Sequence, residues 1–196
     1  MRPLVLASAS PARLRLLRDG GLDPVVVVSG IEETPAYDDP REIVEDLAVR
    51  KAHAVAETLD LPGALVVGCD SLLELDGRVL GKPADAAEAT ERWYAMRGRR
   101  GTLLTGHCVV DTATGARASA VGETVVTFGT PSDEEVAAYV ATGEPVRVAG
   151  AFTIDGRGAA FVERIEGDHG NVVGLSLPLL RGLLADLDVG IIDLWH

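Results

Sequence analysis

The residues best suited to chemistry lie in one short stretch, GCDSLLELDGRVLGKP at positions 68–83. It places an acid, Asp70, at the end of an apolar run and a lysine, Lys82, beyond an Asp-Gly turn. Of the 18 basic residues two are lysines, Lys51 and Lys82, and the rest are arginines. A compact ammonium fits as a point charge beside phosphate oxygens in a tight site. The pattern therefore favours a carboxylate and lysines that act together on a phosphate group.

Each of these residues also has a purely structural interpretation. Lys51 is on the apolar side of an expected helix, where a long side chain lays its stem over the core. The Gly81 and Pro83 around Lys82 are typical of a tight turn, although a turn does not require the lysine. Asp70 at a strand end suits a cap or a solvated loop, but ligands also collect at the carboxyl ends of strands in open α/β sheets. The residues alone leave both interpretations open.

A second candidate site is the segment SASPAR at positions 8–13. Ser10 followed by proline predicts an N-cap and a first helical turn, whose free amides and dipole attract an anion. Ser8 and Arg13 add side-chain donors, although a capped helix start is a common pattern. Glu32 and Glu33, after the second expected strand, are candidates for another carboxylate or are simply solvated.

Familiar catalytic motifs are absent from the sequence. It has no Gly-x4-Gly-Lys-Ser/Thr phosphate loop, GRGAAF lacks the third glycine of the dinucleotide pattern, and neither H-E-x-x-H nor G-x-S-x-G occurs. The four histidines have no spacing typical of a metal site or triad. The two cysteines, Cys69 and Cys108, predict small buried thiols.

The elements that must position these residues alternate between helix and strand early in the chain, and hairpins dominate the middle. Periodicity and capping residues predict helices at 11–20, 40–59, 85–96, 132–142 and 178–187. Apolar runs and turn residues predict strands at 3–8, 24–29 and 64–70, within 101–129 and within 149–167, with a hairpin turn at 76–77. This order predicts a mixed α/β fold, a single domain of residues 1–196 around one long twisted sheet, with a smaller lobe at about 84–145.

Composition limits the partners. A chain of 196 residues with 47% hydrophobic content predicts a compact globular protein. The net charge of −12 argues against a nucleic-acid polymer, because duplex affinity comes mostly from clustered Lys and Arg. No segment reaches the roughly 18 apolar residues of a membrane span, and the apolar start is too short for an export signal. We therefore expect a soluble protein whose anionic partner is small, and the two cysteines, which form no disulfide framework, indicate a reducing, cytoplasmic setting.

Taken in chain order, these stretches resemble the Maf family of nucleotide pyrophosphatases, once described as septum-formation inhibitors. LASASPARLRLL resembles the family's Ser-x-Ser-Pro-Arg-Arg opening, and GCDSLLELDGRVLGKP resembles its Ala-Asp-Thr and Leu-Gly-Lys-Pro segments. GEPVRVAGAFTIDGRGAAFVERIEGDHGNVVGLSLPLL is similar to its closing signature. The match covers nearly the whole chain, and several independent motifs in the right order make it specific.

The resemblance implies a fold like that of inosine triphosphate pyrophosphatases, an elongated mixed sheet flanked by helices with a cleft between two lobes, in proteins that are often homodimers. It implies hydrolysis of a nucleoside triphosphate between the α and β phosphates, giving monophosphate and pyrophosphate. The implied cofactor is Mg²⁺ or Mn²⁺. The expected role is house-cleaning of standard or modified nucleotides.

The resemblance also implies roles for individual residues. Asp70 matches the acid taken as the proton acceptor, and Lys82 matches the catalytic lysine of Gly-Lys-Pro. Glu33 and Asp70 are the expected metal ligands, because Mg²⁺ prefers hard carboxylate oxygens. Arg13, Lys51, Lys82 and the N-terminus of a helix are suited to neutralise the negative charge of a triphosphate. The residues expected to bind substrate are Ser8, Ser10, Arg13, Lys51, Ser71 and Asp155.

Four positions depart from the family pattern. Ala12 replaces the first arginine of the opening pair, which removes one phosphate contact, and Ser71 replaces a threonine but keeps the hydroxyl. Val148 occurs where lysine is common, and Asp155 where glutamine is common. If residue 155 contacts the base, a carboxylate there accepts hydrogen bonds and donates none, unlike an amide. The base preferences of other members therefore do not transfer to this chain.

Two other functions remain open on the sequence. A regulator of division that senses nucleotide, binding triphosphate without turnover, is motivated by Ala12 and by the changed positions at the base site. A nucleotidyltransferase is suggested by the opening LVLASAS before a helix, but the glycine-rich loop of those enzymes is absent. The presence of Asp70 with both lysines favours the pyrophosphatase.

Overall fold

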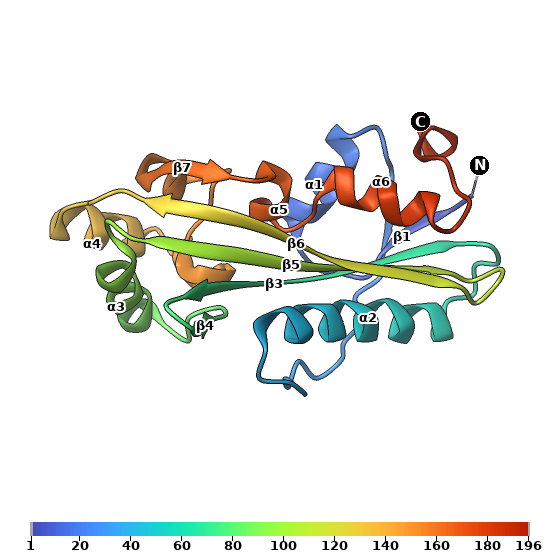
Figure 1. Cartoon of the computed structure of the whole chain (residues 1–196), viewed down its shortest axis with the longest axis horizontal. Helices are drawn as coiled ribbons and strands as arrows, with labels where there is room; N and C mark the ends of the chain where they lie inside the picture. Colours follow the sequence, from blue (N-terminus) through green and yellow to red (C-terminus); the bar gives the residue numbers. More distant parts are fainter. Residues whose placement is uncertain (1, 196) are drawn as a thin grey trace. The chain divides into compact units, whose positions relative to one another are not determined.

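The computed structural model describes residues 2–195 of the chain. Its sheet has seven strands in the order β2-β1-β3-β5-β6-β7, with β4 paired to β3 off this path, and helices flank it (Figure 1). The mixed α/β class predicted from the sequence is confirmed. The chain divides into two compact units. Unit 1 consists of Met1–Asp70, Thr105–Gly122 and Gly174–His196, and unit 2 of Ser71–Leu104 and Glu123–Val173.

Unit 1 is built around a short parallel strand. β1 (Leu4–Leu6) pairs in parallel with β2 (Val25–Val26) on one side and with the first residues of β3 (Leu65–Leu75) on the other. Successive side chains of a strand point to opposite faces, and all three side chains of β1 are buried. Both faces of the sheet must therefore be covered by helices.

Three helices cover these faces. Figure 1 shows α1 (Pro11–Asp19) and α6 (Leu177–Ala185) on one face and α2 (Pro40–Thr58) on the other. All three begin with a side chain that accepts backbone N–H groups and with a proline in the first turn, a combination that favours a helix start. The capping residues are Ser10, Asp39 and Ser176. One apolar core forms under α1 and α6, and a second forms under α2.

Two glycines let α2 lie directly on the sheet. A Cβ at Gly68 in β3 would lie 2.2 Å from the carbonyl oxygen of Ala48, and one at Gly106 in β5 would lie 2.0 Å from that of Val44. No side chain fits at either position while the helix keeps its place. The backbone of α2 therefore packs against the backbone of two strands.

Two long strands, β5 (Arg100–Asp111) and β6 (Arg117–Phe128), contribute residues to both units. The short 3₁₀ helix η4 (Ile191–Leu194) lies near the end of the chain in unit 1. Among residues 2–195, no helix is both long enough and apolar enough to cross a bilayer.

Unit 2 continues β3 into a hairpin with β4 (Arg78–Leu80), through a turn in which Asp76 and Gly77 both have positive φ. Parts of β5 and β6, the strand β7 and several helices complete it. The remaining elements are α3 (Ala86–Met96), α4 (Asp133–Ala141), η1 (Pro145–Arg147), η2 (Ala149–Ala151), η3 (Arg157–Phe161), β7 (Val162–Glu166) and α5 (His169–Val173).

The core of unit 2 is aromatic. Trp93 makes edge-to-face contacts with Phe128, Tyr139 and Phe161, at ring-centroid distances of 5.6 to 5.9 Å. Such contacts add to the stabilisation that burial provides. The indole N–H of Trp93 also donates to the carbonyl of Ala151 at 2.8 Å, which ties the segment after α4 to this core.

For three of the strands predicted from the sequence, the predicted first or last residue was wrong. The strand expected at 24–29 is only Val25–Val26, and the strands expected from residue 149 begin only at Val162, after two 3₁₀ helices. The strand expected to end at Asp70 continues to Leu75, so Asp70 lies inside β3. A continuous ladder to neighbouring strands, invisible in the local sequence, extends β3 past the acid.

Candidate active site

The centre of the site is a buried lysine between two carboxylates. The ammonium nitrogen of Lys51 lies 2.6 Å from Oδ1 of Asp70 and 2.7 Å from Oε1 of Glu33. The side chains of Lys51 and Asp70 are 8% and 11% exposed, whereas that of Glu33 is 55% exposed. The arrangement is thus closed on the side of Asp70 and open to solvent on the side of Glu33.

The close packing of α2 on the sheet explains why Lys51 reaches Asp70. Lys51 lies one residue before Ala52, whose backbone nitrogen is 2.8 Å from the position of a Cβ at Gly68. Gly68 is two residues before Asp70 on β3, so both side chains leave the same helix-strand contact. A lysine at this position is buried because the helix is close, and the carboxylates offset the cost of burying its charge.

Asp70 also lies beside the end of β1. The last pair between β1 and β3 joins Leu6 to Val67, and β3 then runs on without β1 beside it. The expectation that a site forms at the carboxyl end of a parallel strand therefore applies to β1, with Asp70 projecting from its longer neighbour.

The segment after β1 contains the residues predicted to bind an anion. The hydroxyl of Ser10 accepts the N–H of Arg13 and so caps α1, and the hydroxyl of Ser8 accepts the N–H of Ser10. Arg13 donates from its side chain to Ser8 Oγ, to the carbonyl of Cys69 and to that of Gly174. Because Cys69 precedes Asp70, Arg13 ties the start of α1 to the strand that carries the acid.

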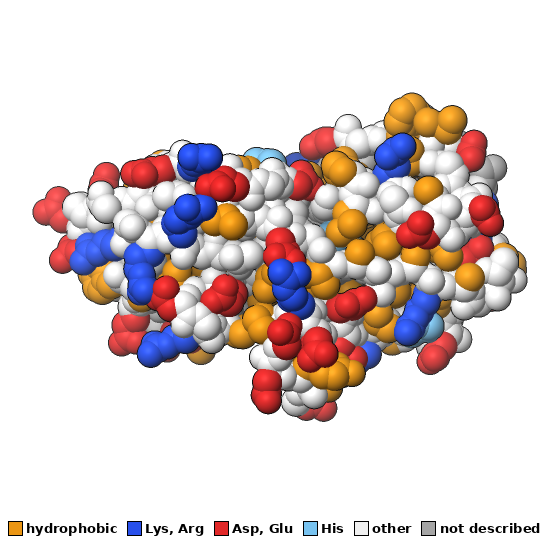
Figure 2. Space-filling model, viewed as in Figure 1, with side chains coloured by type: hydrophobic (Ala, Val, Ile, Leu, Met, Phe, Trp, Pro, Cys, Tyr) orange, Lys and Arg blue, Asp and Glu red, His pale blue; other side chains and the backbone are white. Residues whose placement is uncertain are grey.

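Glu33 lies in a loop whose backbone is bound by Arg50 of α2. Arg50 donates to the carbonyl of Glu32 at 2.6 Å and to that of Thr34 at 3.1 Å, on either side of Glu33. Figure 2 shows acidic side chains gathered on this projecting segment, below the start of α2. Arg50 therefore fixes the loop backbone while Lys51, the next residue, binds the carboxylate.

Lys82, Ser71 and Asp155 belong to unit 2. Lys82 is exposed in a turn whose Gly81 carbonyl accepts hydrogen bonds from the N–H of Gly150 and from the side chain of Arg92. Ser71 is half-buried on β3 directly after Asp70, and Asp155 is exposed in the loop between η2 and η3. The lysine turn is thus anchored at its first residue, while the lysine itself faces solvent.

Several residues that matter here gave no recognisable signal in the sequence. Gly68, Gly106 and Arg50 act through tertiary contacts, and a glycine or an arginine has too many ordinary uses to stand out.

His107 is buried, with Nε2 accepting the N–H of Ser176 at 2.8 Å and Nδ1 2.9 Å from the carbonyl of Thr105. The neutral imidazole with its proton on Nδ1 satisfies both contacts.

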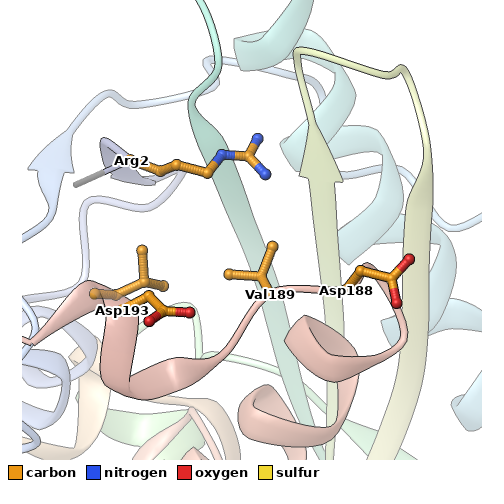
Figure 3. Close-up of a pocket in the computed structure, with 5 residues that line it drawn as sticks. Arg2, Asp188, Val189 and Asp193 are labelled. Carbon is orange, nitrogen blue, oxygen red and sulfur yellow. The ribbon is translucent and has the colours of Figure 1, made fainter.

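The thiols of the two cysteines and a separate pocket take no part in the contacts described above. Cys69 and Cys108 are buried and free, as predicted, and burial raises their pKa to about 11 and about 12. A pocket of about 610 Å³ in unit 1 is lined by Arg2, Val189 and acidic side chains (Figure 3). The guanidinium of Arg2 is bound to Asp111 and to the carbonyl of Gly63, so its charge is already neutralised.

The predicted metal ligands do not form a metal cluster by themselves. Among residues 2–195, no group of three or more His, Cys, Asp or Glu side chains is placed to hold a metal ion. Mg²⁺ commonly keeps several waters and binds to one or two carboxylates together with substrate phosphates. The hard oxygens of Glu33 and Asp70 fit that requirement, with Lys51 supplying the positive charge between them in this structure.

The family model and the related sequences match nearly the whole chain. The family model described as Maf-like protein matches residues 3–187. A Streptomyces coelicolor protein named nucleoside triphosphate pyrophosphatase is 64% identical over 195 residues, which cover 99% of this chain and 95% of that protein. One of the same name from Salinispora tropica is 58% identical over 196 residues, 98% of this chain and 87% of that protein. A crystal structure titled nucleoside-triphosphatase, dITP/XTP pyrophosphatase, from Mycobacterium abscessus shares 21% identity at a TM-score of 0.41, covering 64% of this chain and 74% of that one.

Proposed function

Since the chain belongs to the family of Maf-like proteins, we propose that it hydrolyses nucleoside triphosphates between the α and β phosphates, releasing monophosphate and pyrophosphate. The observation that carries this proposal is the buried Lys51 ammonium between Asp70 and Glu33, with Arg13 of α1 bound to the carbonyl of Cys69, the residue before Asp70. The names of the relatives support the same reaction.

In this mechanism the residues of unit 1 have separate roles. Asp70 orients the attacking water and accepts its proton, as a general base within hydrogen-bond reach. Lys51 and the N-terminal amides of α1 stabilise the negative charge of the phosphates. Arg13, Ser8 and Ser10 hold the start of α1 against β3, so that these groups keep their geometry.

We propose Mg²⁺ or Mn²⁺ as the cofactor, held by Glu33 and Asp70 together with the phosphates. Bound there, a divalent ion would neutralise phosphate charge and would make water at the site more acidic. The ion pairs of Lys51 with both carboxylates support this assignment, because they mark a position where two negative charges face one positive charge. The exposure of Glu33 leaves that carboxylate accessible to an ion that arrives with the substrate.

The remaining proposed roles fall on residues of unit 2 and rest on the family resemblance. Lys82 is proposed as a catalytic lysine that contacts phosphate, and Ser71 as a hydroxyl donor to the substrate. Asp155 contacts the base, where a carboxylate accepts hydrogen bonds only. The expected setting is a cytoplasmic homodimer that removes standard or modified nucleotides and binds no nucleic-acid polymer.

The test is to incubate the purified protein with a panel of triphosphates and Mg²⁺, and to measure pyrophosphate against orthophosphate. We expect pyrophosphate from the wild type, and a loss of at least about a hundredfold in kcat for Asp70→Asn, the order expected when a general base is removed. Asp111→Asn is the matched control, because Asp111 is a buried carboxylate of unit 1 paired with Arg2. Release of orthophosphate would contradict the bond assignment.

The regulator that binds without turnover is the less favoured function, because the relatives are named as enzymes and Asp70 and Lys51 are in contact. Absence of turnover on every base, with retained nucleotide binding, would reverse this order.

A further inference from the structure

One carboxylate of unit 2, that of Glu144, holds the loop 153–158 at its beginning. Glu144 follows α4, and its Oε1 accepts hydrogen bonds from the hydroxyl of Tyr139 at 3.0 Å and from that of Thr153 at 2.5 Å. The Tyr139 hydroxyl in turn accepts the N–H of Thr153 at 3.3 Å. Since Tyr139 is 3% exposed and packs edge-to-face on Trp93, the loop begins on a rigid support.

The end of the same loop binds to the same carboxylate. Oε1 of Glu144 accepts the N–H of Gly158 at 3.1 Å, and Oε2 accepts the N–H of Arg157 at 3.2 Å. Asp155 lies between these two attachment points and is exposed. The loop therefore closes around Glu144 on both sides of the residue proposed to contact the base.

The loop leaves no room for side chains where it passes the carboxylate. A Cβ at Gly156 would lie 2.7 Å from the Thr153 hydroxyl and 2.8 Å from Oε1 of Glu144. One at Gly158 would lie 2.5 Å from the Tyr139 hydroxyl. Glycine at both positions allows the backbone to approach close enough for its N–H groups to reach Glu144.

Glu144 is suited to this task as a carboxylate. Burial opposes its ionisation, but the hydrogen bonds from Thr153, Gly158 and Arg157 outweigh burial and lower its pKa below the ordinary value. An ionised carboxylate accepts from all its donors, whereas an amide would turn N–H groups toward some of them. Replacement by glutamine therefore weakens the attachment without changing the shape of the side chain.

We propose that Glu144 is a positioning residue that sets the base preference of this enzyme, by fixing the loop that carries Asp155. The inference rests on the proposed function and on the base contact proposed for Asp155. Hydrogen bonds weaken steeply when misaligned, so Asp155 discriminates between bases only while its backbone is held in one conformation. Loosening the loop reduces discrimination between bases more than affinity for the triphosphate.

The experiment compares Glu144→Gln with two other variants. Thr153→Val removes one donor and keeps the carboxylate, which gives a milder change if Glu144→Gln folds poorly. Glu135→Gln is the matched control, because Glu135 also accepts a backbone N–H, that of Ser132 at 2.7 Å, but in the capping box of α4. Far-ultraviolet circular dichroism confirms that each variant is folded.

Two measurements are made on each full-length protein. Hydrogen exchange of the peptide that spans residues 153–160 reports the attachment of the loop, and we expect at least about tenfold faster exchange in Glu144→Gln, since hydrogen bonds to charged groups are among the stronger ones. Calorimetric titration with Mg²⁺ and α,β-methylene triphosphates of four bases reports base preference without turnover. We expect the spread of Kd between bases to fall at least about fivefold in Glu144→Gln, less in Thr153→Val, and not at all in Glu135→Gln.

Three results would overturn the inference. Unchanged exchange in Glu144→Gln would show that the carboxylate does not hold the loop. Faster exchange with an unchanged spread of Kd would reduce Glu144 to a structural residue. A wild type that binds all four bases equally would leave no preference to set. Binding without hydrolysis would instead contradict the proposed function, while the loop and its base preference would still be measured.

Discussion

Replacing Lys51 with methionine tests the buried ion pair directly. The change keeps an unbranched side chain of similar length, so the packing of α2 on the sheet is largely retained. It removes the ammonium that lies 2.6 Å from Asp70 and leaves a carboxylate that is 11% exposed without its cation. We therefore expect the variant to be less stable and inactive.

The magnitude follows from the burial of the two partners. Removing one member of a buried ion pair costs about 3–5 kcal/mol, whereas an exposed pair contributes about 0–1 kcal/mol. Because Asp70 is buried and Glu33 is 55% exposed, nearly all of the loss comes from Asp70. We expect the free energy of unfolding to fall by about 3 kcal/mol. For a protein of this size the midpoint of thermal unfolding then falls by roughly 6–12 °C.

The assay is thermal and urea unfolding of Lys51→Met beside Lys82→Met. Lys82 is the other lysine and is exposed, so the same chemical change there should alter stability by less than about 0.5 kcal/mol. In the double variant Lys51→Met/Asp70→Asn no buried carboxylate remains at residue 70, and part of the stability returns. Two results together would refute the reasoning: Lys51→Met unfolds at the wild-type temperature, and the stability changes of Lys51→Met and Asp70→Asn simply add in the double variant.

Two further predictions concern the support of the site. Gly106→Ala should destabilise the protein by about 1–3 kcal/mol in urea unfolding, because its Cβ would lie 2.0 Å from the carbonyl oxygen of Val44. Gly182→Ala is the control: this glycine lies on α6 with open space around it, so alanine there should stabilise the protein by about 0.5–1 kcal/mol. The hydrogen bond from Arg2 lowers the pKa of Asp111, so the stability lost in Asp111→Asn should be full near pH 7. It should begin to shrink as the pH falls past the ordinary aspartate value of about 3.9, and it should vanish only below the lowered pKa of the folded protein. A difference that grew in acid would contradict this sign.

Five helices, α1 to α4 and α6, were predictable because their starts are set by local chemistry, whereas α5 and the short 3₁₀ helices were not predicted. Ser10 with a following proline, and Ser132 with Glu135 three residues later, cap the helices that the sequence predicted there. Each cap is made within a few residues of the chain, so neither depends on the rest of the fold. The same holds for the Asp76-Gly77 turn, whose two positive φ values suit these residue types.

The environment of Lys51 was not predictable, because it depends on contacts between distant residues. The local pattern fits a lysine that lays its stem over the core equally well. Gly68 and Gly106 decide between the two, since they bring α2 onto the sheet and leave the ammonium facing Asp70. An isolated glycine in an apolar run is compatible with many structures, so the sequence does not reveal which backbone approaches it.

The position of Asp70 inside β3 has a consequence for how the site responds to a ligand. A residue within a ladder has its backbone fixed by hydrogen bonds on β3, and Lys51 is fixed by a helix that packs on the same strand. Glu33 is the member of the trio that comes from a loop, and its side chain is the exposed one. If a cation or a triphosphate binds here, as the proposed function requires, the exposed side chain of Glu33 is the part that can adjust at least cost, while Arg50 holds the backbone of its loop. Asp70 keeps its place, as the general base proposed here must if it is to align water with phosphorus.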